Sequence, residues 1–200
     1  MSKELEAARE LVKMLEEREK ADKVELATLN PGEVFKVGEH DFIVLEQRDG
    51  ETAIISKGFM AERVVFDDDT RDYNKSSLKR LIEGEIQPII EAAFGVENLV
   101  EHEVDLTSVD MQNEFGSCVC KVRPITFDEA RKYNNLLVNK ELPDWHWTCT
   151  PWSTEERGWK YSLAVVSPVG DINVICYYDY GGVRPFCILK SNIFVSKKED

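Results

Sequence analysis

The spacing of apolar residues changes along the chain, and each change predicts a different kind of element. Across residues 3–26, apolar side chains recur every three or four positions between charged ones, which predicts an amphipathic helix; they are Leu5, Ala8, Val12 and Leu15. The segment Asn30-Pro31-Gly32 ends this helix, because proline and glycine both interrupt helical backbone. We therefore expect residues 1–30 to form a helical arm and residues 31–200 to form one compact domain.

After this break the apolar period becomes two, which is typical of strands that bury one face. Stretches rich in β-branched residues predict short strands near residues 33–37, 41–47, 52–57 and 62–66. Asp49-Gly50 lies between the second and third of them, and this dipeptide is typical of a type I′ hairpin turn. Strands joined by such short turns favour an antiparallel meander.

Helical signals return in the middle of the chain. Residues 74–83 predict a helix that ends at Gly84. Residues 88–94 predict a second helix, with Pro88 in its first turn, where the missing N–H does no harm. The glycine between these segments leads us to expect two separate helices.

The remaining sequence completes the fold class. A capping box, Thr126-Phe127-Asp128-Glu129, opens a helix that extends to about Val138. Strand patterns occupy four further stretches, at residues 117–122, 161–167, 172–178 and 183–189. The order of helix, strands, helices and strands predicts an α+β fold, in which an antiparallel meander and C-terminal hairpins pack against three or four helices.

Charge is distributed unevenly along this fold. The net charge is −13, and residues 81–120 contain nine carboxylates but no lysine or arginine. Such a field attracts basic protein surfaces and repels phosphate backbones. We therefore expect a protein partner with a basic surface and no direct nucleic-acid binding, because the latter needs clustered lysine and arginine. The alternative is that the acidic tract only keeps the protein soluble.

Two groups of residues are candidates for contact with a partner. One is a set of carboxylates within the acidic tract: Glu91, Glu97, Glu101, Glu103, Asp105, Asp110 and Glu114. The other is the pair Trp152 and Trp159, which flank the polar loop 153–158 and are expected to be exposed. Exposed aromatic side chains are typical anchors of protein interfaces, although aromatic residues also fill small mixed cores.

Cellular location follows from what the sequence lacks. No apolar stretch approaches the ~20 residues that a membrane-spanning helix needs. The N-terminal segment is charged throughout and has no apolar core of a signal peptide. Five cysteines at irregular spacing fit free thiols better than a disulfide framework. We expect a cytoplasmic, non-catalytic protein that has no cofactor and does not enter a membrane.

Four side chains have the number and type of ligands that zinc prefers: Cys118, Cys120, His146 and Cys149. Their spacing is not that of a zinc knuckle, and small buried thiols are common in strands. Whether the four converge on a metal stays open at this point. Cys149 and His146 are also a candidate nucleophile and base, but no residue nearby orients the histidine or forms an oxyanion hole.

The acidic run Asp67-Asp68-Asp69, together with Asp72, has the ligand type of a hard cation site. It lacks the alternating acids, the central glycine and the late glutamate of a calcium loop. A solvated loop that leads into a helix is therefore the favoured interpretation.

Several motifs occur in a fixed order between residues 32 and 189. They are a glycine-led meander at 32–56, a Tyr–Ser–Leu helix motif at Tyr73, Ser77 and Leu78, a Glu-Ala helix at 125–133, a tryptophan-led turn at 147–151 and a closing Gly182-Val183-Arg184-Pro185 strand. In this order they resemble an uncharacterised domain family common in gut bacteria, their phages and prophages. The closing pattern is also distantly similar to the C-type-lectin-like fold shared by formylglycine-generating enzymes. Cys149 stands where the family pattern has an arginine.

The resemblance implies a structural signature formed by Trp147, Gly182, Arg184 and Pro185, and it implies no catalytic residues, because the family has none established. Glycines before Arg184 permit a bulge or a close backbone approach, and Pro185 limits strand pairing. A buried arginine at this place needs carboxylate or carbonyl partners. We expect Arg184 to be an internal strut.

These observations together predict an acidic protein-binding module encoded by a phage or mobile element. Its sharper form is an inhibitor of a host nucleic-acid-targeting defence system, of the anti-CRISPR type, that occupies a basic surface of a CRISPR nuclease or a similar protein in the host cytoplasm. The alternative is a lectin-like small-ligand binder, or an enzyme, that uses the aromatic-rich C-terminal third. A structural component of a virion is a further alternative.

Overall fold

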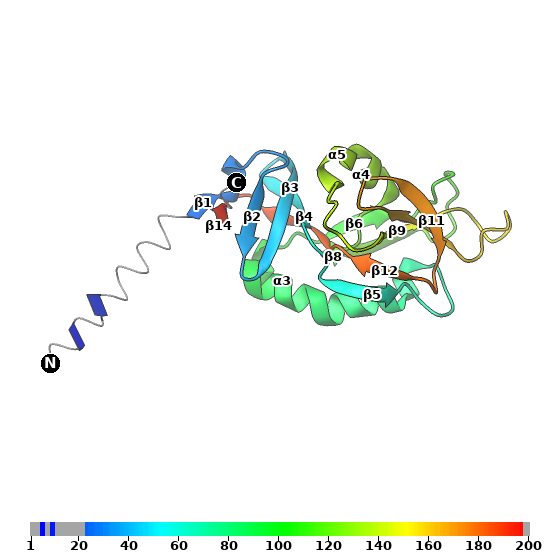
Figure 1. The fold of residues 1–200 in the computed structure, drawn as a ribbon, viewed down its shortest axis with the longest axis horizontal. Helices are drawn as coiled ribbons and strands as arrows, with labels where there is room; N and C mark the ends of the chain where they lie inside the picture. The colour runs from blue at the N-terminus through cyan, green and yellow to red at the C-terminus, as the bar shows by residue number, and fades with distance from the viewer. Residues whose placement is uncertain (1–4, 7–8, 11–22, 198–200) are drawn as a thin grey trace.

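The computed structural model describes residues 5–6, 9–10 and 23–197 of the chain (Figure 1). Most of the predicted N-terminal helix, residues 3–26, lies outside these ranges. Its last part is not helical, because Lys23–Glu25 form strand β1 and Leu26–Thr28 form a turn of 3₁₀ helix. The prediction fails there for a tertiary reason: β1 pairs with β14 (Phe194–Lys197), and Leu26 is fully buried in the core.

A seven-stranded antiparallel sheet forms one half of the described structure, in the order β1-β14-β2-β3-β4-β13-β8. The predicted meander is confirmed. Asp49 and Gly50 have φ angles of 54° and 82°, as a type I′ turn requires. The strands not yet placed are β2 (Val34–Val37), β3 (His40–Arg48), β4 (Glu51–Ser56), β8 (Val122–Arg123) and β13 (Phe186–Lys190).

A five-stranded sheet forms the other half, in the order β11-β10-β9-β12-β5. Only β9 and β12 run parallel among these neighbours, and the remaining pairs are antiparallel. The strands are β5 (Ala61–Val65), β9 (His146–Pro151), β10 (Ser162–Val166), β11 (Ile172–Cys176) and β12 (Tyr180–Val183).

Two predictions about the last third of the chain are wrong. Residues 147–151, expected to form a turn, belong to β9, whose residues are all buried. Its sequence does alternate between polar and apolar residues, but polar ones such as Thr148 and Thr150 are buried as well, because both faces of the strand are covered. Residues 183–189, expected to form one strand, are divided: Arg184 and Pro185 carry the chain from β12 in the smaller sheet to β13 in the larger one.

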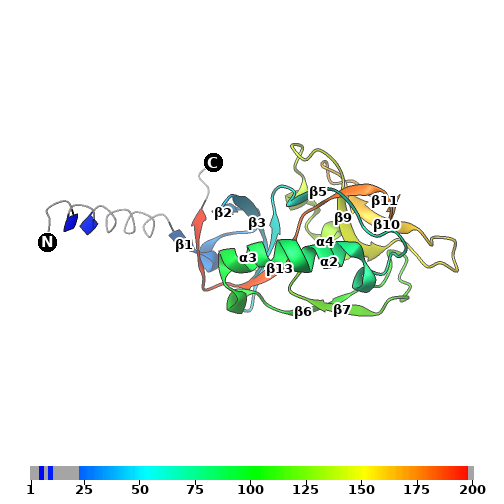
Figure 2. The same cartoon turned by 90° about the horizontal axis from the view of Figure 1, so that it is seen from below.

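One long helical segment lies along the side of the molecule (Figures 1 and 2). It consists of α2 (Ser77–Leu81), a π-helical turn (Ile82–Ile86) and α3 (Gln87–Phe94), which follow one another without a break. The prediction that Gly84 ends a helix is therefore wrong, because Gly84 lies inside the π turn. This wide turn comes just before Pro88, whose ring would clash with the carbonyl of Gly84 in a regular α-helix.

The capping box at Thr126 is confirmed, with the side chain of each partner bonded to the backbone N–H of the other. The helix that it opens is shorter than predicted, because α4 (Phe127–Lys132) ends before α5 (Asn134–Leu137) begins. The predicted three or four helices are not confirmed. In its broad class the fold is α+β and dominated by strands. None of the described helices is long and apolar enough to cross a membrane.

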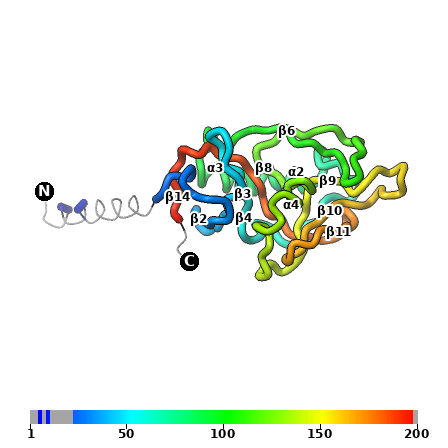
Figure 3. Tube along the Cα trace, turned by 90° about the horizontal axis from the view of Figure 1, so that it is seen from above, coloured from blue at the N-terminus to red at the C-terminus, as the bar shows by residue number. Residues whose placement is uncertain are grey.

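The strands β6 (His102–Asp105) and β7 (Ser117–Cys120) form a separate two-stranded ribbon. Figure 2 shows this ribbon beside the long helix, and Figure 3 shows it at the edge of the molecule. The main core lies between the ribbon, the helix and both sheets, since Cys118 of β7, Ile86 of the helix and Trp147 of β9 belong to one buried cluster.

Candidate functional site

The outer face of the β6–β7 ribbon displays part of the acidic tract. Along β6, Val104 is buried while Glu103 and Asp105 are exposed, and Glu101 is exposed just before the strand. On β7, Val119 lies opposite Glu103 and is 57% exposed. We call this surface, formed by Glu101, Glu103, Asp105 and Val119, the acidic ribbon face.

The carboxylates near this face have no cationic partner among the residues that the structure describes. Glu103 accepts a hydrogen bond from Ser117, and Asp105 accepts two from Thr107. Within the part of the chain that the structure describes, no lysine or arginine pairs with them, with Glu101 or with the exposed Glu97 after α3. Their negative charge is therefore presented to solvent uncompensated.

The other candidate carboxylates form internal contacts. Glu114 pairs with Arg71 and Asp110 with Arg157, the latter at 2.6 Å between carboxylate oxygen and guanidinium nitrogen. Glu91 lies 4.0 Å from the ammonium group of Lys121 and accepts a hydrogen bond from Gln87. All three cations come from outside residues 81–120, with Lys121 directly following the tract, and they neutralise this part of it.

Asp110 shows how strongly one of these contacts holds a carboxylate ionised. Ser108 and Ser153 donate hydrogen bonds to it, both at 2.6 Å, and Arg157 adds a charged partner. These contacts, with those from the two serines the largest, lower the pKa of Asp110 from 3.8 to about 2. Asp110 thereby stabilises the folded loop, and its negative charge is compensated by Arg157 within the protein.

The tryptophan pair lies beside this neutralised region. Trp152 and Trp159 have ring centroids 6.1 Å apart, with Trp152 half-buried and Trp159 41% exposed. The buried Arg71 holds their loop by donating hydrogen bonds to the carbonyls of Ser153 and Lys160. The structure therefore brings the tryptophans next to Asp110 and Glu114, the half of the tract whose charge is compensated.

Further exposed aromatic residues surround this loop. Tyr161, Tyr178 and Tyr180 are each about half exposed, and Tyr161 and Tyr178 contact each other and the buried Tyr177. The sequence does not single out these tyrosines as exposed. A strand alternation over 172–178 does not predict their exposure, because β11 ends at Cys176.

Two apolar residues near the acidic ribbon face were missed from the sequence. Val119 has a local signal, since alternation along 117–122 places it opposite to Cys118 and Cys120. Met111 has none: it is 75% exposed with a φ of 64°, at the tip of a loop that Ser108 fixes by bonding the backbone of Gln112. Met111 lines a groove of about 340 Å³. Val119 lies on the ribbon, whose strand β6 lines the same groove.

Arg184 lies in the interior, where β12 crosses to β13. It is 1% exposed, and it donates hydrogen bonds to the carbonyls of Ser56 and Leu137, both at 2.9 Å. Its Nη1 also lies 3.4 Å from Nε2 of His146. Burial without a carboxylate partner lowers the pKa of Arg184 to about 10. Carbonyl contacts to two distant segments are those of a strut.

Among the described residues, no group of three or more His, Cys, Asp or Glu side chains is arranged to hold a metal ion. Cys149 packs in the main core with its Sγ 3.8 Å from the carbonyl oxygen of Ile125, whereas His146 lies beside Arg184, so the two side chains have different surroundings. Their buried environments also oppose acid–base chemistry, since burial raises the pKa of Cys149 to about 12 and burial beside Arg184 lowers that of His146. Neither the zinc site nor the cysteine–histidine pair considered from the sequence is formed by the described residues.

The acidic run before α2 is solvated only in part, because Asp68 and Asp69 are exposed but the other two aspartates are not. Asp67 and Asp72 are buried. Asp67 accepts hydrogen bonds from the backbone N–H groups of Asp69, Thr70 and Ser77, and Asp72 accepts one from Asn74. Both carboxylates accept hydrogen bonds from backbone N–H groups near the start of helical turns, which is the usual role of aspartate at such places.

Comparison with known proteins adds no relative: no family model, no curated protein and no solved structure matches this chain. The resemblance to a phage-associated family and to the lectin-like fold therefore stays a prediction from the motifs. The case for a function is made from the surfaces of the molecule.

Proposed function

We propose that this protein is a protein-binding module whose acidic ribbon face engages a basic surface on a partner protein. One observation carries the proposal: Glu97, Glu101, Glu103 and Asp105 are exposed without a cationic partner among the described residues, while other carboxylates of the same tract are neutralised internally. A partner that brings lysine or arginine to this face gains attraction in proportion to the uncompensated charge.

Two apolar side chains supply the contact area that charges alone do not. Val119 lies within the acidic ribbon face, and Met111 stands at the rim of the neighbouring groove. Methionine is enriched at the buried centre of protein interfaces, while surrounding charges steer the encounter and set its specificity. The combination fits a partner surface with basic residues around an apolar centre.

The motif resemblance gives this proposal its sharper form. In that form the partner is a host protein that handles nucleic acid, such as a CRISPR nuclease, and the acidic ribbon face occupies its basic channel in place of phosphates. The protein is then encoded by a phage or mobile element and acts as an inhibitor of the host defence system. The sharper form predicts that this protein and nucleic acid compete for binding to one nuclease. A competition binding assay tests this directly.

The general proposal is tested by capture from a bacterial lysate with matched variants. The test variant is Glu101→Gln/Glu103→Gln/Asp105→Asn, and the control is Glu51→Gln/Asp68→Asn/Glu156→Gln, which removes the same charge from exposed positions elsewhere. We expect a specific protein to bind the wild type and the control but not the test variant. Raising the salt concentration from about 0.1 M to about 1 M shortens the Debye length from about 10 Å to about 3 Å. This screening should release the captured protein.

Two results contradict the proposal. Equal capture by the test variant and the wild type shows that the acidic ribbon face is not the binding surface. A captured partner whose binding does not weaken with salt shows that charge complementarity is not the basis of recognition. Circular dichroism of each variant confirms that the fold is intact before capture is compared.

A further inference from the structure

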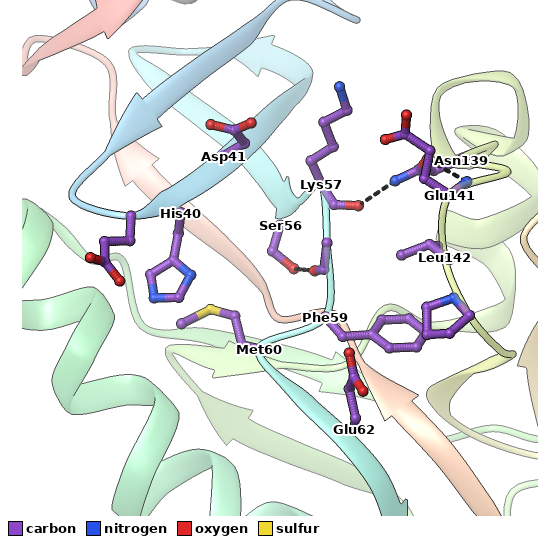
Figure 4. A pocket seen from close by; sticks show the side chains of 13 residues that line it. His40, Asp41, Ser56, Lys57, Phe59, Met60, Glu62, Asn139, Glu141 and Leu142 are labelled. Atoms are coloured by element: carbon purple, nitrogen blue, oxygen red, sulfur yellow. Dashed lines mark hydrogen bonds between the residues drawn. The ribbon is translucent and has the colours of Figure 1, made fainter.

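A second concave surface lies away from the acidic ribbon face. It is a cleft of about 400 Å³ between the β2–β3 turn, the connection from β4 to β5 and the loop 139–143 (Figure 4). Figures 2 and 3 show that loop and β6 on opposite sides of the molecule. Its volume lies within the range of ligand-binding pockets, about 300–1,000 Å³.

The floor of the cleft is apolar. Phe59 and Met60 come from the β4–β5 connection, and Leu142 and Pro143 come from the facing loop. Figure 4 shows Met60, Phe59 and Leu142 in the middle of the cleft. The ring of Phe59 is packed against the backbone of Gly182, where an added Cβ would lie 2.2 Å from a ring carbon. Gly182, a residue of the predicted signature, therefore permits this floor to form.

The rim of the cleft is acidic. Glu39, Asp41, Glu62 and Glu141 line it, against one lysine, Lys57. Figure 4 shows the carboxylates of Asp41, Glu62 and Glu141 around the apolar centre. Within the described residues, the carboxylates of Glu39, Glu62 and Glu141 take part in no ion pair or side-chain hydrogen bond.

The two main walls of the cleft are tied together. Asn139 donates a hydrogen bond to the carbonyl of Lys57 across the cleft, at 3.0 Å. Behind it, Arg184 binds the carbonyl of Ser56 on one wall and that of Leu137 at the base of the other. The strut at Arg184 thus holds both walls at a set separation, so a ligand does not have to order them on binding.

We propose that this cleft binds the lysine or arginine side chain of a partner polypeptide. The long aliphatic part of such a side chain covers the apolar floor, and its charged end reaches the carboxylates at the rim. The face of Phe59 adds a favourable surface for a cation. The acidic rim would repel an anionic ligand. A neutral ligand would partly desolvate the carboxylates of the rim without supplying a positive charge in return. The inference rests on the proposed function only in requiring a basic polypeptide, and it uses a separate surface.

The test is a titration followed by NMR of protein with labelled methyl groups. The probes are acetyl-Gly-Lys-Gly-amide, its arginine counterpart and a norleucine counterpart that has the aliphatic chain without the charge. We expect the methyl signals of Met60 and Leu142 to shift with the lysine and arginine peptides, with a Kd of about 1 mM, and much less with the norleucine peptide. Free n-butylamine, which has the aliphatic chain and the single charge of a lysine side chain, is titrated in parallel, and we expect it to bind no more tightly than the lysine peptide.

Variants assign the effect to the rim. Glu62→Gln/Glu141→Gln is expected to weaken binding of the lysine peptide about fivefold, because two exposed ion pairs are lost. Glu51→Gln/Glu156→Gln removes the same charge elsewhere and is expected to leave the affinity unchanged. The ribbon variant Glu101→Gln/Glu103→Gln/Asp105→Asn is expected to lose capture of the partner and to keep the response of the cleft.

Four outcomes overturn the inference. They are the absence of methyl shifts with either basic peptide, equal binding of the norleucine peptide, an unchanged affinity in Glu62→Gln/Glu141→Gln, and tighter binding of n-butylamine than of the lysine peptide. If one of them occurs while the acidic ribbon face still captures its partner, the cleft proposal fails and the proposed function stands. The reverse pattern removes the proposed function and leaves the cleft as a separate site.

Discussion

The two halves of the acidic tract have similar composition but opposite roles in the folded protein. Around β6, Glu101, Glu103 and Asp105 point to solvent with no cationic partner in the described structure. A few residues later, Asp110 and Glu114 are bonded to arginines from other parts of the chain. A run of acidic residues is therefore not one functional unit, because distant cations decide which charges remain available.

The difference has a structural cause. The chain between β6 and β7 folds back on the loop that carries the tryptophans, and the buried Arg71 lies between them. A buried guanidinium needs carboxylate or carbonyl partners, and Glu114 supplies one. The strand β6 has its opposite face on the core, so its acidic residues can only point outward.

The largest expected effect comes from breaking the neutralised half. Arg71→Met leaves the carbonyls of Ser153 and Lys160 and the carboxylate of Glu114 without their donor, and we expect the free energy of unfolding to fall by about 3 kcal/mol. Chemical denaturation measures it. Arg131→Met, which removes an exposed arginine, should change that free energy by less than about 0.5 kcal/mol. Equal effects of the two would mean that Arg71 does not hold this region together.

A reciprocal pair of variants separates binding from stability. Glu101→Gln/Glu103→Gln/Asp105→Asn should weaken affinity for a captured partner by about 2 kcal/mol, roughly thirtyfold, with little change in unfolding. Asp110→Asn/Glu114→Gln should show the opposite, with lower stability and unchanged affinity. Isothermal calorimetry and thermal unfolding measure the two quantities. The comparison between the halves breaks down if both variants lose affinity to the same extent.

The apolar residues beside the uncompensated half should have a smaller effect. Met111→Ser or Val119→Ser is expected to weaken partner binding by about 1 kcal/mol, roughly fivefold, because an exposed apolar contact is lost. Stability should stay within about 0.5 kcal/mol of the wild type, since both side chains are already exposed in the folded protein. Unchanged affinity in both variants would show that the interface is purely electrostatic.

The smallest effect is a pH dependence confined to the neutralised half. The folded state lowers the pKa of Asp110 from 3.8 to about 2, so its contribution to stability is present above pH 3.8 and is lost as the pH falls towards about 2. Thermal unfolding of the wild type and Asp110→Asn should therefore differ near neutral pH and converge in acid. A constant difference across that range would exclude the hydrogen-bonded carboxylate as its source.

How much of the fold is predictable from the sequence differs from element to element. The meander, the Asp49-Gly50 turn and the capping box at Thr126 are predicted correctly because their signals lie within a few residues. The strand β9 is missed because the tryptophan-led motif at 147–151 resembles a turn, and only its pairing with distant strands makes it the centre of a sheet. The separation of β12 from β13 is missed because the stretch 183–189 reads continuously as strand, although its residues join two different sheets.

The candidate site divides in the same way. The acidic tract and an outward Val119 follow from composition and alternation. The exposure of Met111 and the apolar floor of the cleft do not, because they depend on loops that pack against segments distant in sequence. The neutralisation of Glu114 depends on Arg71, which is 43 positions away.

Local sequence patterns were enough to place the meander, its Asp49-Gly50 turn, the capping box at Thr126 and the acidic tract, since these properties depend on residues close together in the chain. Only the tertiary structure decided which carboxylates remain uncompensated, because that depends on which cations the fold brings to them. It also decided what Arg184 does: its carbonyl partners lie 128 and 47 positions away, on the two walls of one cleft. The physical reason is that burial and charge pairing are properties of neighbours in space, and no local pattern contains them.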